Sequence, residues 1–304
     1  MTAFRELRRK HPATGKKDNL AAYLFLAPWV LGLLVITIGP MVASLFLGFT
    51  DYNLLQPPEW AGFDNFVRMA GDERLHKALG VTFTYVFVSV PLQLGLALLL
   101  AVVLDRGLRG LAFYRSVFYL PSLLGSSVAI AILWQRIFGS DGLVNYALEL
   151  FGIQGRSWIS EPATALSTLV VLNVWTFGAP MVIFLAGLRQ IPSMYYEAAA
   201  VDGAGAVRRF RSITLPLLTP IIFFNLVLQI IHAFQAFTQA FVVSNGTGGP
   251  SDSTLLFSLY VYQRAFGNFD MGYASAMGWV LLLIIAAFTA VNFLASRYWV
   301  FYDD

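Results

Sequence analysis

Six long stretches of this chain are almost free of charged residues, and they set the first expectation about its fold. A helix needs about 20 apolar residues to cross the hydrocarbon core of a bilayer. The stretches cover residues 20–49, 78–104, 116–138, 165–188, 213–243 and 274–297. The sequence therefore predicts an all-α, polytopic membrane protein with six transmembrane helices.

Prolines modify two of these expected helices. The first and fifth stretches are longer than one straight span needs. Gly39 and Pro40 are expected to end or kink the first helix, because proline lacks an amide hydrogen and its ring clashes with the preceding turn. Pro216 and Pro220 are expected at the start of the fifth span.

Composition supports a membrane protein and removes several kinds of chemistry. Hydrophobic residues make up 58% of the chain and charged residues 12%, where a typical soluble domain carries about 25% charged residues. The chain has no cysteine, which excludes disulfides, thiolate metal sites and cysteine nucleophiles. Its three histidines lack the spacing of a zinc site. We therefore expect no catalytic residues, no metal and no cofactor.

Basic residues are distributed unevenly among the loops that join the apolar stretches. Fourteen of the 20 fall on one side, namely Arg5, Arg8, Arg9, Lys10, Lys16, Lys17, Arg106, Arg109, Arg115, Arg189, Arg208, Arg209, Arg211 and Arg297. Lysine and arginine are enriched in cytoplasmic loops, so both termini of a multi-pass cytoplasmic-membrane protein are expected inside. This divides the chain into a cytoplasmic tail (1–19), a six-span domain (20–298) with a cytoplasmic loop at about 189–212, and a second cytoplasmic tail (299–304).

The loop before the fifth stretch has the sequence of two short helices joined by a turn. Ser193 follows a proline and can cap the first helix, whose residues 195–201 are rich in alanine. Gly203 is expected to end that helix, since glycine adopts the left-handed conformation without a steric cost. The second helix is expected to run from about Ala206 and to stop at Pro216. Such a slim helical projection suits docking into a cleft of another protein.

This loop resembles a known signature. The "EAA" motif of permease subunits of binding-protein-dependent ABC importers is matched by Glu197-Ala198-Ala199, Asp202-Gly203-Ala204, Phe210, Ile213-x-Leu215-Pro216 and Pro220. Two further segments resemble the MalF-like half of the carbohydrate-uptake branch of that family. They are Gly246-x-Gly248-Gly249-Pro250 and the ending Trp299-Val300-Phe301-Tyr302. The resemblance covers roughly residues 20–302.

The resemblance implies a permease that moves a sugar by alternating access, powered by separate ATPase subunits. The implied residues for coupling to the ATPase are Glu197, Ala198, Ala199, Asp202, Gly203 and Ala204. The implied partners are a second, MalG-like permease, two ATP-binding subunits, an external solute-binding protein, the sugar-like solute and membrane lipid, with no nucleic acid. The binding protein is expected to contact the outer loop at Gly248, Gly249 and Pro250.

Absent motifs bear on the energy source. No Gly-x-x-x-x-Gly-Lys-Ser/Thr occurs, so the chain is expected to be a transporter subunit without an ATPase site of its own. The main alternative is an ion-coupled secondary transporter, and such proteins bury ionisable groups near the bilayer midplane. All 17 acidic residues here fall in loops or tails, and His232 is the midplane candidate. An intramembrane enzyme would need converging catalytic groups, which the pattern does not offer.

The fifth stretch carries a polar stripe that is the expected substrate path. The stripe consists of Asn225, Gln229, His232, Gln235 and Gln239. On one helix these residues fall within an arc of roughly 120°. Neutral amides and an imidazole suit a hydroxyl-rich sugar, while another neutral or a phosphorylated polyol-type solute is the alternative. The same residues could instead hold the helix against a neighbour, and the sequence leaves both interpretations open, as it leaves the sugar unnamed.

Overall fold

The computed structural model describes residues 16–105 and 110–301, and this part of the chain is mostly helical. Four helical segments in it are long and apolar enough to cross a membrane: Tyr23–Leu47, Glu73–Asp105, Ala206–Val243 and Met271–Trp299. Two bent helix pairs bring the number to six when each pair is counted as one span. The predicted all-α, six-span fold is therefore confirmed.

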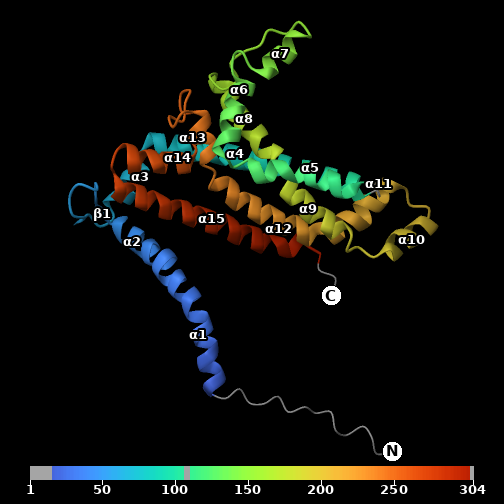
Figure 1. Ribbon diagram of the computed structural model, residues 1–304, viewed down its shortest axis with the longest axis horizontal. Coiled ribbons are helices and arrows are strands. Elements are labelled where there is room, and N and C mark those ends of the chain that lie inside the picture. Colours follow the sequence, from blue (N-terminus) through green and yellow to red (C-terminus); the bar gives the residue numbers. More distant parts are fainter. Residues whose placement is uncertain (1–15, 106–109, 302–304) are drawn as a thin grey trace, which may run out of the picture.

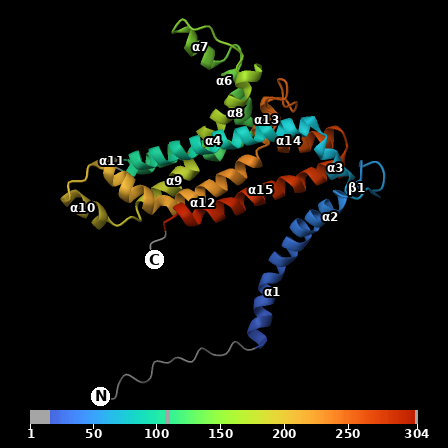
Figure 2. The same cartoon turned by 180° about the vertical axis from the view of Figure 1, so that it is seen from behind.

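The first span is a continuous helix, and its α2 end contacts the last span. It consists of α1 (Lys16–Gly32), a π-helical turn η1 (Leu33–Ile38) and α2 (Gly39–Leu47). Pro40 does not end this helix, because the wider turn before it, closed by the Gly39 amide on the Leu34 carbonyl, accommodates the proline ring. The α2 end approaches the rest of the chain while α1 diverges from it (Figures 1 and 2).

A compact outer segment leads from the first span to the second. The strands β1 (Thr50–Asp51) and β2 (Glu59–Trp60) pair antiparallel, with Thr50 opposite Trp60. They are followed by α3 (Asp64–Ala70), whose buried Asn65 donates to the carbonyls of Gly48 (3.0 Å) and Thr50 (2.9 Å). The second span, α4 (Glu73–Asp105), is one helix of 33 residues that begins five residues before the apolar stretch and continues through Pro91.

The third and fourth spans are each broken into two helices. α5 (Leu111–Leu124) and the segment that starts with α6 (Val128–Phe138) meet at 95°, and α8 (Pro162–Trp175) and α9 (Gly178–Leu188) meet at 41°. The expectation of a single span over 116–138 did not include this turn. The Ser127 side chain accepts a hydrogen bond from the Ile130 amide (3.3 Å) and so caps α6 in its new direction.

The segment from α10 to α13 corrects two details of the fifth span. α10 (Ser193–Val201) is followed by a continuous helical run of α11 (Ala206–Arg209), η2 (Phe210–Thr214) and α12 (Leu215–Phe234). The prediction that the helix stops at Pro216 is wrong, because the π-helical turn η2 precedes the proline and relieves the clash that its ring would cause. The helix instead ends at Phe234, and α13 (Thr238–Val243) follows after a break.

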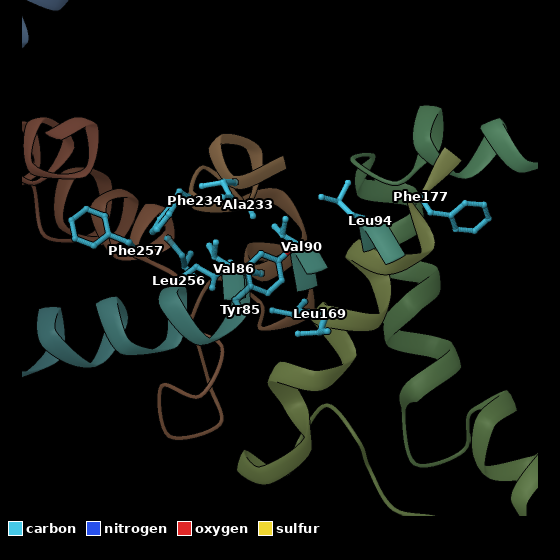
Figure 3. Packing of buried hydrophobic residues seen from close by; sticks show 14 of the residues in the cluster. Tyr85, Val86, Val90, Leu94, Leu169, Phe177, Ala233, Phe234, Leu256 and Phe257 are labelled. Atoms are coloured by element: carbon cyan, nitrogen blue, oxygen red, sulfur yellow. The ribbon is translucent and has the colours of Figure 1, made fainter. Parts of the chain in front are cut away.

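α4 packs against α8, α9 and α12 and organises the interior. α14 (Phe257–Tyr262), η3 (Gln263–Gly267) and α15 (Met271–Trp299) complete the described chain. Side chains from α4, α8, α12, the start of α14 and the residue before it form one buried cluster (Figure 3): Tyr85, Val86, Val90, Leu169, Phe234, Leu256 and Phe257. The main spans lie side by side along the long axis, with α3 and α14 at one end and α10 at the other (Figures 1 and 2).

Candidate functional site

The predicted coupling segment is a short helix closed by a left-handed turn. α10 ends at Val201, and Gly203 has a φ of 74°. The Gly203 amide donates to the Ala200 carbonyl (3.0 Å), and the Ala204 amide donates to the Ala199 carbonyl (2.8 Å). These two bonds form a Schellman motif, which satisfies carbonyls that the helix end would otherwise leave free. The prediction that Gly203 ends this helix in the left-handed conformation is confirmed.

The coupling segment exposes four of the six residues that the resemblance assigns to coupling. Glu197, Ala198, Asp202 and Gly203 are exposed, while Ala199 and Ala204 are half-buried. The latter two, with Asp202 and residues at the start of the next helix, line a recess of about 200 Å³. Ser193 makes no capping hydrogen bond, because Pro192 occupies the cap position and Ser193 is already the first helical residue. The segment is therefore a helical projection held by its own turn.

Two contacts fix the base of this projection. The hydroxyl groups of Tyr196 in α10 and Thr214 in η2 lie 2.9 Å apart and share a hydrogen bond. Just before α10, the Arg189 guanidinium pairs with the Asp105 carboxylate at the end of α4 (3.4 Å). The projection is therefore attached both to the fifth span and to the second.

The five residues of the polar stripe do not share one environment. Asn225 is fully buried, Gln229 is half-buried, and His232 and Gln235 are exposed. Gln239 lies beyond the helix break, on α13, and donates to the Gly125 carbonyl where the third span turns (3.1 Å). The predicted 120° arc assumed one helix through all five residues, and that assumption is wrong for Gln239.

A polar cluster that the sequence analysis missed lies at the breaks of the third and fourth spans. Gln93 of α4 donates to the Thr176 hydroxyl (3.0 Å), and the Ser122 hydroxyl of α5 donates to the Thr176 carbonyl (2.8 Å). Asn173 donates to the Gln93 side chain (3.4 Å). The signal for this cluster was present as polar residues within apolar stretches. Their meeting depends on how three spans pack.

The outer loop predicted to meet the binding protein is tightly built. Gly248 has a φ of 75°, and a Cβ atom there would lie 2.6 Å from the Leu255 side chain. The Gly248 amide donates to the Ser244 hydroxyl (2.9 Å), and the Thr254 hydroxyl donates to the Gly249 carbonyl (2.8 Å). Gly248 is buried, whereas Gly249 and Pro250 are half-buried. Contacts within the loop therefore hold the backbone around Gly248 and Gly249.

A second missed feature is an ionic cluster at the same end of the molecule. The Asp72 carboxylate accepts hydrogen bonds from the hydroxyls of Tyr260 and Tyr273 (2.8 Å each) and pairs with Arg264 (3.1 Å). Burial would raise the pKa of Asp72, but these hydrogen bonds, that of the Leu75 amide and the charge of Arg264 outweigh it and hold the pKa below its usual value. The position of this acid in the sequence indicates only a loop residue.

The chain is similar to known proteins over most of its length. The family model for the binding-protein-dependent transport system inner membrane component matches residues 69–300. The chain is 56% identical over 291 residues to the probable ABC transporter permease protein YesP of Bacillus subtilis (strain 168), a match that covers 95% of this chain and 94% of that protein. It is 33% identical over 297 residues to the lactose transport system permease protein LacF of Rhizobium radiobacter, covering 94% of this chain and 99% of that protein.

The fold is also similar to that of a solved transporter chain. A chain in the crystal structure of a bacterial alginate ABC transporter, in complex with an alginate pentasaccharide-bound periplasmic protein, matches with a TM-score of 0.80 at 23% identity. The match covers 92% of this chain and 95% of that chain. Together with the sequence matches, these findings show that the chain belongs to the family of binding-protein-dependent transport system inner membrane components, the permease subunits of ABC transporters.

Proposed function

We propose that this chain is the permease subunit of an ATP-driven importer that carries a sugar-like solute into the cell. The observation that carries the proposal is the exposed helical projection of α10, closed at Gly203 and attached to both the second and the fifth spans. A projection of this kind can pass a mechanical displacement to the spans because its base is fixed. The coupling role of Glu197, Ala198, Ala199, Asp202, Gly203 and Ala204 rests on this geometry and on the signature they match.

The energy enters from other chains in this proposal. The sequence holds no phosphate-binding loop, which fits a transporter subunit without an ATPase site. As the resemblance implies, two separate ATP-binding subunits hydrolyse the ATP. A second, MalG-like permease completes the solute path, and an external solute-binding protein delivers the solute to residues 248–250. Both termini and the α10 projection lie in the cytoplasm, as the distribution of basic residues favours.

The solute path in this proposal runs past the breaks of three spans. Discontinuous membrane helices commonly form solute sites near the midplane, since their freed backbone groups and polar side chains can meet a ligand. Gln239 and the cluster of Gln93, Ser122 and Thr176 stand at such breaks, and Gln229 and His232 stand on the helix that leads to them. These groups are neutral amides, hydroxyls and an imidazole, which suit a hydroxyl-rich solute. Relatives named for lactose and for trehalose/maltose transport support that class.

Uptake into proteoliposomes tests this proposal. The reconstituted complex should accumulate a labelled sugar only with ATP inside and the binding protein outside, and a pH or sodium gradient should not replace ATP. If an ion gradient alone drives uptake, the ATP-driven function is wrong and the secondary transporter is correct.

The substrate path needs its own test. Gln229→Leu and His232→Leu should change the relative uptake rates of a panel of sugars in assembled complexes. Asn292→Leu is a matched control, because its amide donates to the Phe288 carbonyl of its own helix (2.8 Å). If the two stripe variants assemble and keep the sugar preference of the control, the stripe holds helices together and does not line the path.

A further inference from the structure

A bidentate ion pair joins the outer loop to the start of the second span. Two nitrogen atoms of Arg74, in the first turn of α4, donate to the two carboxylate oxygens of Asp252 at 3.0 and 2.8 Å. A third contact reaches the Thr247 carbonyl (3.4 Å), and the Arg74 guanidinium lies over the Tyr260 ring, 5.4 Å from its centroid. Parallel paired bonds of this kind fix geometry more closely than a single charge contact does.

The loop that Arg74 holds has an unusual backbone. Ser251 and Asp252 have φ values of 50° and 56°, in the left-handed region that residues other than glycine rarely adopt. Two consecutive residues in that region are held only when surrounding contacts over-determine them. The bidentate pair acts on Asp252 itself. The loop shape therefore depends on a contact from a different span, 178 residues away in the sequence.

The residues around Arg74 are held in place by further contacts. Asp72, two residues earlier, accepts hydrogen bonds from Tyr260 of α14 and Tyr273 of α15. Burial and the hydrogen bond to Asp72 raise the pKa of Tyr260, so its hydroxyl remains a donor at neutral pH. Arg264 lies against the same rings and pairs with Asp72. Arg74 therefore attaches the loop to a rigid junction of the second and sixth spans.

We propose that Arg74 and Asp72 are positioning residues that hold residues 245–256 in the shape that receives the external binding protein. The proposal rests on the proposed importer function and adds to it the residues that preorganise the docking loop. A preorganised loop binds more tightly because its ordering precedes binding. The tip at residues 247–251 stays at least partly accessible apart from Gly248, so the clamp supports the loop from the side and leaves its tip available.

The clamp also has a direct connection to the opposite side of the membrane. Arg74 is the second residue of α4 and Asp105 is its last, and the helix between them is unbroken. Asp105 pairs with Arg189, just before the coupling helix α10. One helix therefore contacts the docking loop through its first turn and the base of the coupling segment through its last residue.

The experiment has two readouts on the reconstituted complex. Hydrogen–deuterium exchange of residues 245–256 in the absence of the binding protein reports the clamp directly. Stimulation of ATP hydrolysis by the binding protein that copurifies with the complex then gives its half-saturating concentration. Arg74→Gln should speed exchange in the loop and raise the half-saturating concentration about fivefold, the factor expected from loss of one good exposed ion pair. The maximal stimulated rate should change less than the half-saturating concentration.

Three further variants separate positioning from general damage. Arg74→Lys keeps the charge but loses the paired bonds, so its effect should be intermediate. The exchange of charges in Arg74→Asp with Asp252→Arg should recover part of the loss. Arg156→Gln removes a more exposed ion pair, with Glu161 (3.1 Å), in the outer lobe formed by residues 139–161 between α6 and α8, and should leave both readouts unchanged.

The outcomes are distinguishable. Unchanged exchange in Arg74→Gln overturns the clamp, and faster exchange with an unchanged half-saturating concentration overturns the positioning role. A wild-type complex that shows no stimulation by the binding protein contradicts the proposed importer function instead, while the exchange readout still decides whether the clamp holds the loop.

Discussion

Substitution of Gly203 gives the most direct test of the coupling segment. Its φ of 74° lies in the left-handed region, and a Cβ atom built there meets nothing within 4 Å. Replacement by alanine therefore adds no steric contact, and its whole effect is the backbone cost of about 1–2 kcal/mol for an L residue in this conformation. A nine-residue helix is marginal in water by itself. A cost of about 1–2 kcal/mol should therefore reduce the population of the closed turn about 5–30-fold.

Different substitutions of Gly203 should reduce coupling by different amounts. Asparagine tolerates the left-handed conformation, so Gly203→Asn should lose less than Gly203→Ala. Valine is β-branched and should lose more than alanine. Gly203→Pro should lose most, because proline fixes φ near −65° and removes the amide that donates to the Ala200 carbonyl. The measurement is the ratio of sugar taken up to ATP hydrolysed in proteoliposomes, together with retention of the ATP-binding subunits on purification.

Two glycines provide matched controls for this series. Gly205 is two residues away and equally open, but its φ is −68°, so Gly205→Ala should have little effect. Gly152 has a φ of 74° and open space around it but lies in the outer lobe, so Gly152→Ala carries the same backbone cost without an effect on coupling. If Gly203→Ala and Gly205→Ala behave alike, or if Gly203→Pro couples normally, the turn at Gly203 does not control coupling.

Two further predictions concern the outer face. Asp72→Asn should lower the thermal unfolding temperature in detergent at pH 7. Folding lowers the pKa of Asp72, so its contribution to stability is complete above the ordinary pKa of 3.8 and is lost as the pH falls through the lowered pKa. This group should therefore contribute no pH dependence of stability between pH 7 and 5. Asn145→Ala should lower the free energy of local unfolding of the lobe around α7 (Leu143–Glu149) by about 2–4 kcal/mol. The Asn145 side chain accepts a hydrogen bond from the Trp158 indole and donates to the carbonyls of Gly139, Ser140 and Arg156. Limited proteolysis should cut this lobe faster than in Asn292→Ala, and equal cleavage of the two variants would contradict the assigned role of Asn145.

Local sequence determined the parts of this protein that depend on chain composition and on single conformational preferences. Long apolar runs have to form helices in a membrane because every backbone polar group must be satisfied internally, so six spans followed from the pattern. Gly203 closed its helix as expected because few other residues adopt that backbone. The two hydrogen bonds that close this turn join residues three and five positions apart.

The tertiary structure decided where the spans break and which polar residues meet. Gln239 donates a hydrogen bond to the break of the third span at residues 125–127. The Thr176 carbonyl accepts a hydrogen bond from the Ser122 hydroxyl, 54 positions earlier in the chain. The same holds for Arg74 and Asp252, whose bidentate pair joins residues that read separately as loop charges. The physical reason is that a hydrogen bond or an ion pair depends on the positions of two backbones. A single sequence shows which groups need partners and leaves the choice of partner to the packing of the spans.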